Sequence, residues 1–245
     1  MLNLRLFWGA FKYSLPVLLG YLATGAAFGL MMSEAGYTWS LALLMSVVMY
    51  TGAGQYIAVG LFASGAGLAE SAIVQLVVNA RHIAYGITMF KKFNVPGACK
   101  PYLIFALTDE TFALLSALDG ASGSPEAPEE KNRYGRDARE RGIFMLYVSA
   151  LNHLYWVFGT LIGAFAGAVL PFNFEGISFA LTALFIVLMI EQIMRVKKIL
   201  PFAIAALAAV LTVIFLPARV SLLSALAAAL AAVQIFSPKS QVEKI

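Results

Sequence analysis

The sequence predicts an all-α protein, a polytopic bundle of membrane helices. Of its 245 residues, 61% are hydrophobic and only 12% are charged, and the mean hydropathy is +0.83. Ordinary soluble domains are about one quarter charged, so this composition indicates an integral membrane protein. Its apolar segments are continuous rather than alternating with polar residues, which disfavours a membrane β-barrel.

Eight apolar runs approach the length that crosses a hydrocarbon core, about 20 residues as helix. The last two are short and separated only by residues 217–219, so seven crossings with one re-entrant segment remain an alternative. We expect some helices to be discontinuous and the chain to form a single transmembrane domain over residues 1–245. The runs cover residues 14–33, 40–63, 69–90, 102–118, 143–169, 177–194, 200–216 and 219–236.

The first run follows Arg5 and Lys12 and has no small-residue cleavage pattern, so we expect a retained helix rather than a signal peptide. Within it, G25-A-A-F-G29 has the small-xxx-small spacing that brings membrane helices together. The fifth run repeats this spacing as G159-T-L-I-G163-A-F-A-G167. We interpret both as packing motifs, the longer one with a possible role in a subunit contact.

The second run is interrupted by Y50-T-G-A-G-Q-Y56. Gly52 and Gly54 lower helix propensity and permit unwinding. Unwound backbone at membrane depth is tolerated only where it lines a cavity or is buried in protein. Gln55, Thr51 and Asn79 are candidates to satisfy the freed groups. The alternative is that the two glycines only let another helix approach closely.

The third run carries Arg81 within V77-V-N-A-R-H-I-A-Y-G86. Arginine at the centre of a membrane helix costs about 2.5 to 3.5 kcal/mol on insertion scales, so it usually has a partner or a wet cavity. Asp109 and Glu110 of the fourth run are the candidates, and they diverge by about 100° on a helix. We predict that Asp109 pairs with Arg81 and that Glu110 stays free to titrate. The alternative is a purely structural ion pair.

Both histidines also lie in apolar runs, in N79-A-R-H82-I-A-Y85 and N152-H153-L-Y155. Histidine changes charge near neutral pH, which allows proton handling, whereas neutral hydrogen-bonded packing is the alternative. The single cysteine, Cys99, and the absence of an H-E-x-x-H motif argue against a metal site. We predict no metal, no cofactor and no enzymatic activity.

The polar segment 119–142 is expected to be a solvated loop, because it is too poor in apolar residues to form a packed structure. In the eight-crossing scheme this loop lies in the cytoplasm. With a cytoplasmic N-terminus and eight crossings, twelve Lys and Arg residues fall inside and four outside. Lys91, Lys92 and Lys100 lie outside in this scheme, against the positive-inside rule. This conflict indicates that the second or third run does not fully cross.

A zwitterionic solute would fit these groups. A guanidinium and helix N-terminal N–H groups suit a carboxylate, and a carboxylate suits an ammonium. The combination of GYLATGAAFGLM, YTGAGQY, LVVNARHIAYG and ALTDETFAL resembles the AzlC-type large subunit of bacterial branched-chain amino acid exporters, over most of the chain. The resemblance implies export of small apolar amino acids across the bacterial cytoplasmic (inner) membrane, driven by an ion gradient. It also implies a small AzlD-type membrane subunit as a partner.

The expected partners are therefore the substrate, that subunit and the lipid bilayer, with no nucleic acid. A proton-driven exporter needs a carboxyl that takes up a proton on one side and releases it on the other. Glu110 is predicted to do this, with His82 as the alternative carrier. The predicted substrate-binding or coupling residues are Gln55, Asn79, Arg81, His82, Asp109 and Glu110, with Gly52, Gly54, Asn152 and His153 as secondary candidates.

Three other functions stay open at this point. The chain could transport another small metabolite or a metal ion. It could be a non-transporting scaffold subunit, whose buried charges bind a partner helix. The third is an intramembrane hydrolase or metalloenzyme that uses His82, His153, Glu110 and Glu191.

Overall fold

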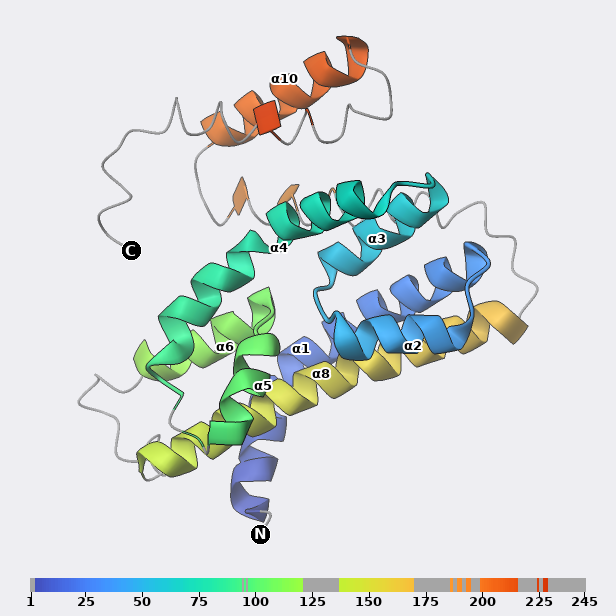
Figure 1. Ribbon diagram of the computed structural model, residues 1–245. Helices are drawn as coiled ribbons and strands as arrows, with labels where there is room; N and C mark the ends of the chain where they lie inside the picture. Colours follow the sequence, from blue (N-terminus) through green and yellow to red (C-terminus); the bar gives the residue numbers. More distant parts are fainter. Residues whose placement is uncertain are drawn as a thin grey trace. The chain divides into compact units, whose positions relative to one another are not determined.

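The computed structural model confirms the predicted helical class (Figure 1). It describes residues 3–93, 95, 97–120, 137–169 and 199–215, with isolated positions between 186 and 228, and no strand occurs among them. The chain groups into two compact units, Met1–Gly65 with Gln75–Phe174 and Ala66–Val74 with Glu175–Ile245. The single domain over residues 1–245 stays a prediction.

Two long helices form the stem of the first unit, α1 (Leu4–Glu34) and α8 (Ala138–Val169). They have 31 and 32 residues, about 46 to 48 Å at 1.5 Å per residue. Both are long and apolar enough to cross a membrane. They contain the predicted first and fifth runs and extend them toward their N-termini.

The helices α1 and α8 lie side by side and run in the same direction. At their starts Arg5 forms a salt bridge of 3.0 Å with Glu140. Toward their ends, a Cβ atom on Gly167 would lie 2.7 Å from the Cβ of Ser33. Because the N-terminal ends of α1 and α8 lie together, and so do their C-terminal ends, both helices cross the membrane from the same side.

Small residues hold this helix pair together. A Cβ atom on Gly25 would lie 2.8 Å from the carbonyl oxygen of Trp156. One on Gly159 would lie 2.8 Å from the carbonyl oxygens of Tyr21 and Leu22. The two small-xxx-small motifs therefore pack against each other, which uses the face of α8 that the sequence had suggested for a subunit contact.

The second predicted run is discontinuous, as expected, and consists of α2 (Trp39–Val48) and α3 (Ala53–Ala63). The ring of Tyr37, just before α2, lies 5.7 Å from that of Phe62 at the end of α3. The chain therefore enters and leaves this segment at the same end (Figure 1). With 10 and 11 residues, each half covers about 15 to 17 Å, roughly half of a hydrocarbon core.

The third run forms one helix, α4 (Leu68–Phe90), of 23 residues. After it come η1 (Gly97–Cys99), α5 (Lys100–Phe105) and α6 (Asp109–Gly120). The Lys100 ammonium lies 3.9 Å from the ring centroid of Phe90, so α5 begins at the end of α4. Ser116 of α6 lies 4.0 Å from the sulfur of Met89, so α6 ends there too. The fourth run is thus a second doubled-back segment, whose break the sequence analysis did not predict.

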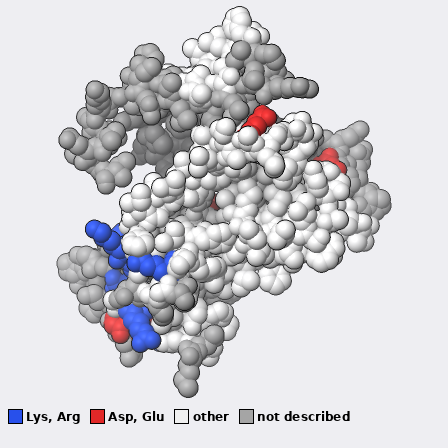
Figure 2. Space-filling model, in the orientation of Figure 1, with Lys and Arg blue, Asp and Glu red and all other residues white. Residues whose placement is uncertain are grey.

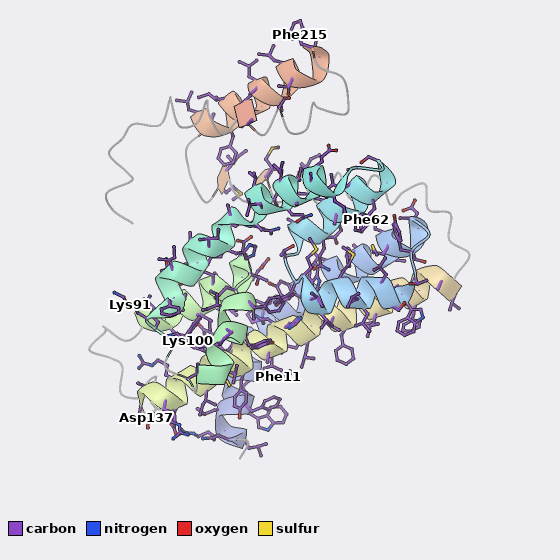
Figure 3. The ribbon with its side chains drawn as sticks, viewed as in Figure 1. Phe11, Phe62, Lys91, Lys100, Asp137 and Phe215 are labelled. Atoms are coloured by element: carbon purple, nitrogen blue, oxygen red, sulfur yellow. The ribbon has the colours of Figure 1, made fainter. Side chains whose placement is uncertain are left out.

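These two hairpins explain why the basic loop after α4 does not contradict the positive-inside rule. Tyr13 near the start of α1 bonds the Leu114 carbonyl of α6 at 2.9 Å, whereas Tyr21 lies near the start of α6. Hence α6 runs toward the side where α1 and α8 begin. Figure 2 shows Lys and Arg side chains gathered at that end, and Figure 3 places Lys91, Lys100 and Asp137 there. The lysines at 91, 92 and 100 therefore lie on the side of the N-terminus, as a hairpin that does not cross requires.

The second unit contains α10 (Leu200–Phe215), which matches the predicted run at 200–216. The predicted runs at 177–194 and 219–236 lie mostly outside the described residues. So does most of the predicted polar loop, whose two ends belong to α6 and α8. At its far end, Asp137 accepts a bond of 2.7 Å from the Glu140 amide and so caps the start of α8.

Candidate functional site

The break between α2 and α3 depends on left-handed backbone. Gly52 has φ +57°, a region that glycine enters without penalty. Tyr50 has φ +37° although it is a bulky residue and only 2% exposed. Such conformations cost about 1 to 3 kcal/mol each and cluster at functional sites. The predicted unwinding around Gly52 is therefore present.

Gly54 has a different role at the same break. A Cβ atom there would lie 2.8 Å from Gln75 Oε1 and 3.0 Å from Asn79 Nδ2, both on α4. Gln75 Nε2 donates to the Gly54 carbonyl at 2.8 Å, and Asn79 Nδ2 donates to Gln75 Oε1 at 2.9 Å. Close approach, the alternative interpretation, thus holds for Gly54, while unwinding holds for Gly52.

Gln55 anchors the first turn of α3 in the interior. It is fully buried, and its Nε2 donates to Ser46 Oγ at 3.1 Å. Ser46 Oγ in turn lies 2.8 Å from Thr160 Oγ1 of α8. Gln55 therefore joins both halves of the first hairpin to the stem, rather than capping backbone freed by the break.

Arg81 on α4 pairs with Asp109 at the start of α6, which confirms the predicted partner. The other carboxylate oxygen of Asp109 accepts from Tyr85 OH at 2.6 Å, and the Tyr85 ring stacks on Phe112 at 4.4 Å. Asp109 therefore has a partner at each carboxylate oxygen, whereas Arg81 Nε is buried without an acceptor among the described residues. The guanidinium fixes the first turn of α6 against α4.

Glu110 has no basic partner among the described residues, as predicted. Its carboxylate accepts from Tyr21 OH at 2.7 Å, a partner that was not predicted from the sequence. Tyr21 OH also lies 2.5 Å from Thr108 Oγ1, and Tyr21 is buried while Glu110 is exposed in the isolated chain. Glu110 is thus an accessible carboxylate held by one phenol.

Thr108 defines where α6 begins. Its Oγ1 accepts from the Thr111 amide at 3.2 Å, which is an N-cap interaction. Asp109 and Glu110 then occupy the first turn, where negative charge complements the helix dipole. Asn152, fully buried on α8, donates to Thr111 Oγ1 at 3.0 Å and ties this turn to the stem.

The two histidines have different surroundings. His153 Nε2 lies 3.1 Å from the Ser46 carbonyl, which can only accept, so Nε2 carries the proton. Its Nδ1 lies 3.2 Å from Tyr102 OH, and its ring stacks on Tyr50 at 4.2 Å. His153 therefore has a partner at each ring nitrogen and links α8 to both hairpins, which favours the packing interpretation.

His82 makes one hydrogen bond, from Nδ1 to the Asn79 carbonyl at 3.2 Å, and its ring lies edge-on to Tyr85 at 5.8 Å. His82 follows Arg81 in the chain, and it makes no hydrogen bond with a carboxylate among the described residues. In the same part of the chain, no group of three or more His, Cys, Asp or Glu side chains could hold a metal ion.

Four residues that shape this site were not predicted from the sequence, namely Tyr21, Tyr85, Thr108 and Trp156. Thr108 followed by two acidic residues is a helix-start signature and could have been recognised. Tyr85 lies one turn after Arg81, on the same face of the helix. The contacts of Tyr21 and Trp156 depend on the packing of α1 against α8 and leave no local signal.

These features define the class of protein: a polytopic α-helical membrane protein whose interrupted helices start in a polar interior. The AzlC protein family matches residues 16–170, and the chain belongs to this family. The Bacillus subtilis "Branched-chain amino acid transport protein AzlC" is 36% identical over 78% of this chain and 70% of its own.

Other relatives are named more generally. An "Uncharacterized membrane protein" of Helicobacter pylori (strain J99) is 39% identical over 78% of each chain. The Escherichia coli "Inner membrane protein YgaZ" is 26% identical over 77% of this chain and 74% of its own. No solved structure matches the chain.

Proposed function

We propose that this protein is a secondary transporter that exports branched-chain and related apolar amino acids from the cytoplasm. The observation that carries the proposal is the pair of half-helix starts, at Ala53 and Asp109, inside one bundle. Discontinuous helices of this kind form the substrate and ion sites of many secondary transporters. The Bacillus subtilis relative is named for branched-chain amino acid transport, which supports the substrate class.

The proposed substrate site lies around the two half-helix starts. Gln55 and Asn79 hold the start of α3, with Gly52 and Gly54 shaping its backbone. Arg81 and Asp109 hold the start of α6, with His82 beside them. Asn152 and His153 fix both hairpins to α8.

Glu110 is proposed to couple export to the proton gradient. As a carboxylate without a basic partner, it can take up a proton from outside and release it to the cytoplasm. A substrate ammonium group would compete with that proton for the same oxygens. Competition of this kind produces exchange, because the site cannot hold both cations at once. Inward proton flow would then drive outward substrate flow.

The proposed setting is the bacterial cytoplasmic membrane, with the N-terminus in the cytoplasm. Basic residues at the starts of α1 and α8 and at the end of α4 share one side, and such residues are retained inside. A small AzlD-type membrane subunit is the proposed partner.

Reconstituted vesicles test the proposal. Protein in proteoliposomes, with and without a co-expressed AzlD-type subunit, is loaded with labelled L-leucine, and efflux is measured under an imposed pH gradient. Efflux should require the protein and accelerate when the external solution is acidic. Leucine flux that never exceeds that of empty vesicles, even with the subunit, would favour a scaffold role. Flux of a metal ion or another metabolite alone would reassign the substrate.

A further inference from the structure

A chain of neighbouring oxygen atoms leads from Glu110 into the interior of the first unit. Tyr21 OH lies 2.7 Å from Glu110 Oε2 and 2.5 Å from Thr108 Oγ1. Thr108 Oγ1 lies 3.0 Å from Thr111 Oγ1, in a geometry that makes Thr108 the donor. Glu110 is exposed in the isolated chain, whereas Tyr21, Thr108 and Thr111 are buried. The chain therefore joins an accessible carboxyl group to three buried hydroxyl groups.

The far end of this chain is an acceptor. Thr111 is fully buried, and its Oγ1 also accepts from Asn152 Nδ2 at 3.0 Å. A hydroxyl oxygen has two lone pairs, and the bonds from Thr108 and Asn152 use both of them. Thr111 Oγ1 is therefore placed to receive a hydrogen from Thr108 and not to donate one back.

The three contacts along the chain need three hydrogen atoms. Each hydroxyl group has one hydrogen to donate. When Glu110 is charged, Tyr21 and Thr108 supply two hydrogens, so one contact has two oxygen atoms with no hydrogen between them. A proton on Glu110 Oε2 supplies the third hydrogen, because Glu110 then donates to Tyr21. Tyr21 in turn donates to Thr108, and Thr108 to Thr111.

We propose that Tyr21, Thr108 and Thr111 are positioning residues that stabilise the proton-bound form of Glu110. This inference rests on the proposed function, in which Glu110 carries the coupling proton, and it adds the residues that hold the proton there. Loss of the proton breaks only the O–H bond of the carboxyl group. Tyr21 then donates to the carboxylate, and Thr108 turns its hydrogen toward Tyr21. The hydrogen bond from Thr108 to Thr111 is lost.

The same hydroxyl group links the proton to the start of α6, because Thr108 is the N-cap of that helix. In the proton-bound form its hydrogen bonds to Thr111, which Asn152 ties to α8. In the charged form the hydrogen points to Tyr21 of α1 instead. Release of the proton thus exchanges a contact within α6 for a contact with α1, at a helix start that belongs to the proposed substrate site.

Other titratable and charged side chains lie on the elements packed around Glu110. Among the described residues, Tyr21 is the one titratable side chain that hydrogen-bonds to Glu110. The guanidinium near it is paired with the adjacent carboxylate. The groups are Asp109 on α6, Arg81 and Tyr85 on α4, Tyr50 at the first break, Tyr102 on α5 and His153 on α8.

A threonine that does not touch Glu110 gives the sharpest test. Thr111→Val keeps the side-chain shape and removes the acceptor at the end of the chain. The proton-bound form then loses one hydrogen bond along the chain, and the charged form loses none. One neutral hydrogen bond corresponds to roughly 0.4 to 1 pH unit. We expect the midpoint for proton binding to Glu110 to move toward acid by that amount.

Infrared spectroscopy measures this midpoint in the purified full-length protein. The C=O band of a protonated carboxyl group is followed during a pH titration, and the signal of Glu110 is the part that Glu110→Gln removes. Thr111→Ser keeps the hydroxyl group and should restore the wild-type midpoint. Thr111→Cys has a thiol that is a weak acceptor, so it should shift the midpoint in the same direction as valine with less disturbance of the packing.

Thr160→Val is the matched control. It also removes a fully buried threonine hydroxyl, but the partners of that group are Ser46 and the Trp156 carbonyl rather than the chain. Its midpoint should stay at the wild-type value. A second check cuts the chain next to the carboxyl group. In a Tyr21→Phe background, Thr111→Val should cause no further shift.

The outcomes separate this relay from the proposed function, because the titration needs no substrate. A midpoint that stays in place or moves toward alkaline pH in both Thr111→Val and Thr111→Cys overturns the relay, while leucine transport stands. A full shift by Thr111→Val in the Tyr21→Phe background overturns it too. A wild-type protein that shows the expected shifts and moves no leucine overturns the proposed function and leaves the relay in place.

Discussion

The two interrupted helices have the same architecture and opposite chemistry. The α2–α3 break is built from glycine and left-handed backbone, and its polar groups are uncharged. The α5–α6 break, at residues 106–108, has no positive φ, begins with a threonine cap and carries two carboxylates. Each break ends in a half-helix start, where the dipole favours anions. At α6 two acidic side chains already occupy that position, whereas the first turn of α3 carries no acidic residue.

Two helix starts in one bundle can therefore carry opposite electrostatics. A helix start left bare attracts a negative group. The same start furnished with carboxylates, one neutralised by Arg81 and one not, can hold a cation instead.

Removing the guanidinium should have the largest effect. Arg81→Ala leaves Asp109 without its cation, and breaking a desolvated pair costs about 3 to 5 kcal/mol. We expect leucine export to fall to background in proteoliposomes. Normal export by this variant would show that the charged break is not part of the site.

A double variant separates folding from transport. Arg81→Gln with Asp109→Asn replaces the pair by neutral groups of similar shape, so membrane insertion and thermal stability should recover. If the pair only stabilises the structure, transport recovers with them. Continued absence of transport in a stable protein would assign the charges to the cycle itself.

The uncharged break should respond to a single methyl group. Gly54→Ala would press a Cβ atom against Gln75 and Asn79. Gly52→Ala would put alanine at φ +57° and ψ −96°, and such conformations cost about 1 to 3 kcal/mol. Both should lower the unfolding temperature in detergent. Gly60→Ala is the matched control in the same helix, since nothing lies within 4 Å of its Cβ position. There, helix propensity predicts a gain of up to about 1 kcal/mol.

Neutralising Glu110 should affect coupling more than binding. Glu110→Gln mimics the protonated carboxyl and can still accept the Tyr21 hydrogen bond. We expect leucine exchange across the vesicle membrane to continue and efflux to lose its dependence on the pH gradient. If this variant still concentrates leucine against a gradient at the wild-type rate, the proton binds elsewhere.

The smallest effect is expected far from both breaks. Shortening the polar segment within residues 121–136 removes Pro, Ser and charged residues that cannot bury apolar surface. Asp137 is kept, because it caps α8. Export should match that of the full chain, and a loss with normal insertion would assign the segment a docking or gating role.

Much of this contrast could be predicted from the sequence. Hydropathy located the helices, the two glycines located the first break, and the cost of burying Arg81 identified Asp109 as its partner. The second break was missed because Leu107 and Thr108 interrupt no apolar pattern, although the threonine cap marks a helix start. A hairpin of two half-length helices also has the same hydropathy as one helix that crosses the membrane. Hydropathy therefore does not show that the chain turns back, whereas a contact such as that between Tyr37 and Phe62 does.

The partner of Glu110 could not be predicted in the same way. Tyr21 lies 89 positions earlier, and the phenol reaches the carboxylate because α1 and α6 both pack against α8. Contacts between residues that are far apart in the sequence therefore decide which partner each charged side chain has.

The parallel pairing of α1 with α8 has a consequence for how the chain is made. Glu34 ends α1 and Ala138 begins α8, 104 positions later. At roughly 5 to 20 residues per second, the ribosome needs about 5 to 20 s to deliver that intervening stretch. Throughout that time the glycine face of α1 is in the membrane without its partner. The half-length hairpins are synthesised in the same interval, before the stem that anchors them is complete. Biogenesis of this protein therefore includes a waiting period, in which insertion factors or lipids must shield the first helix until the last part of its stem arrives.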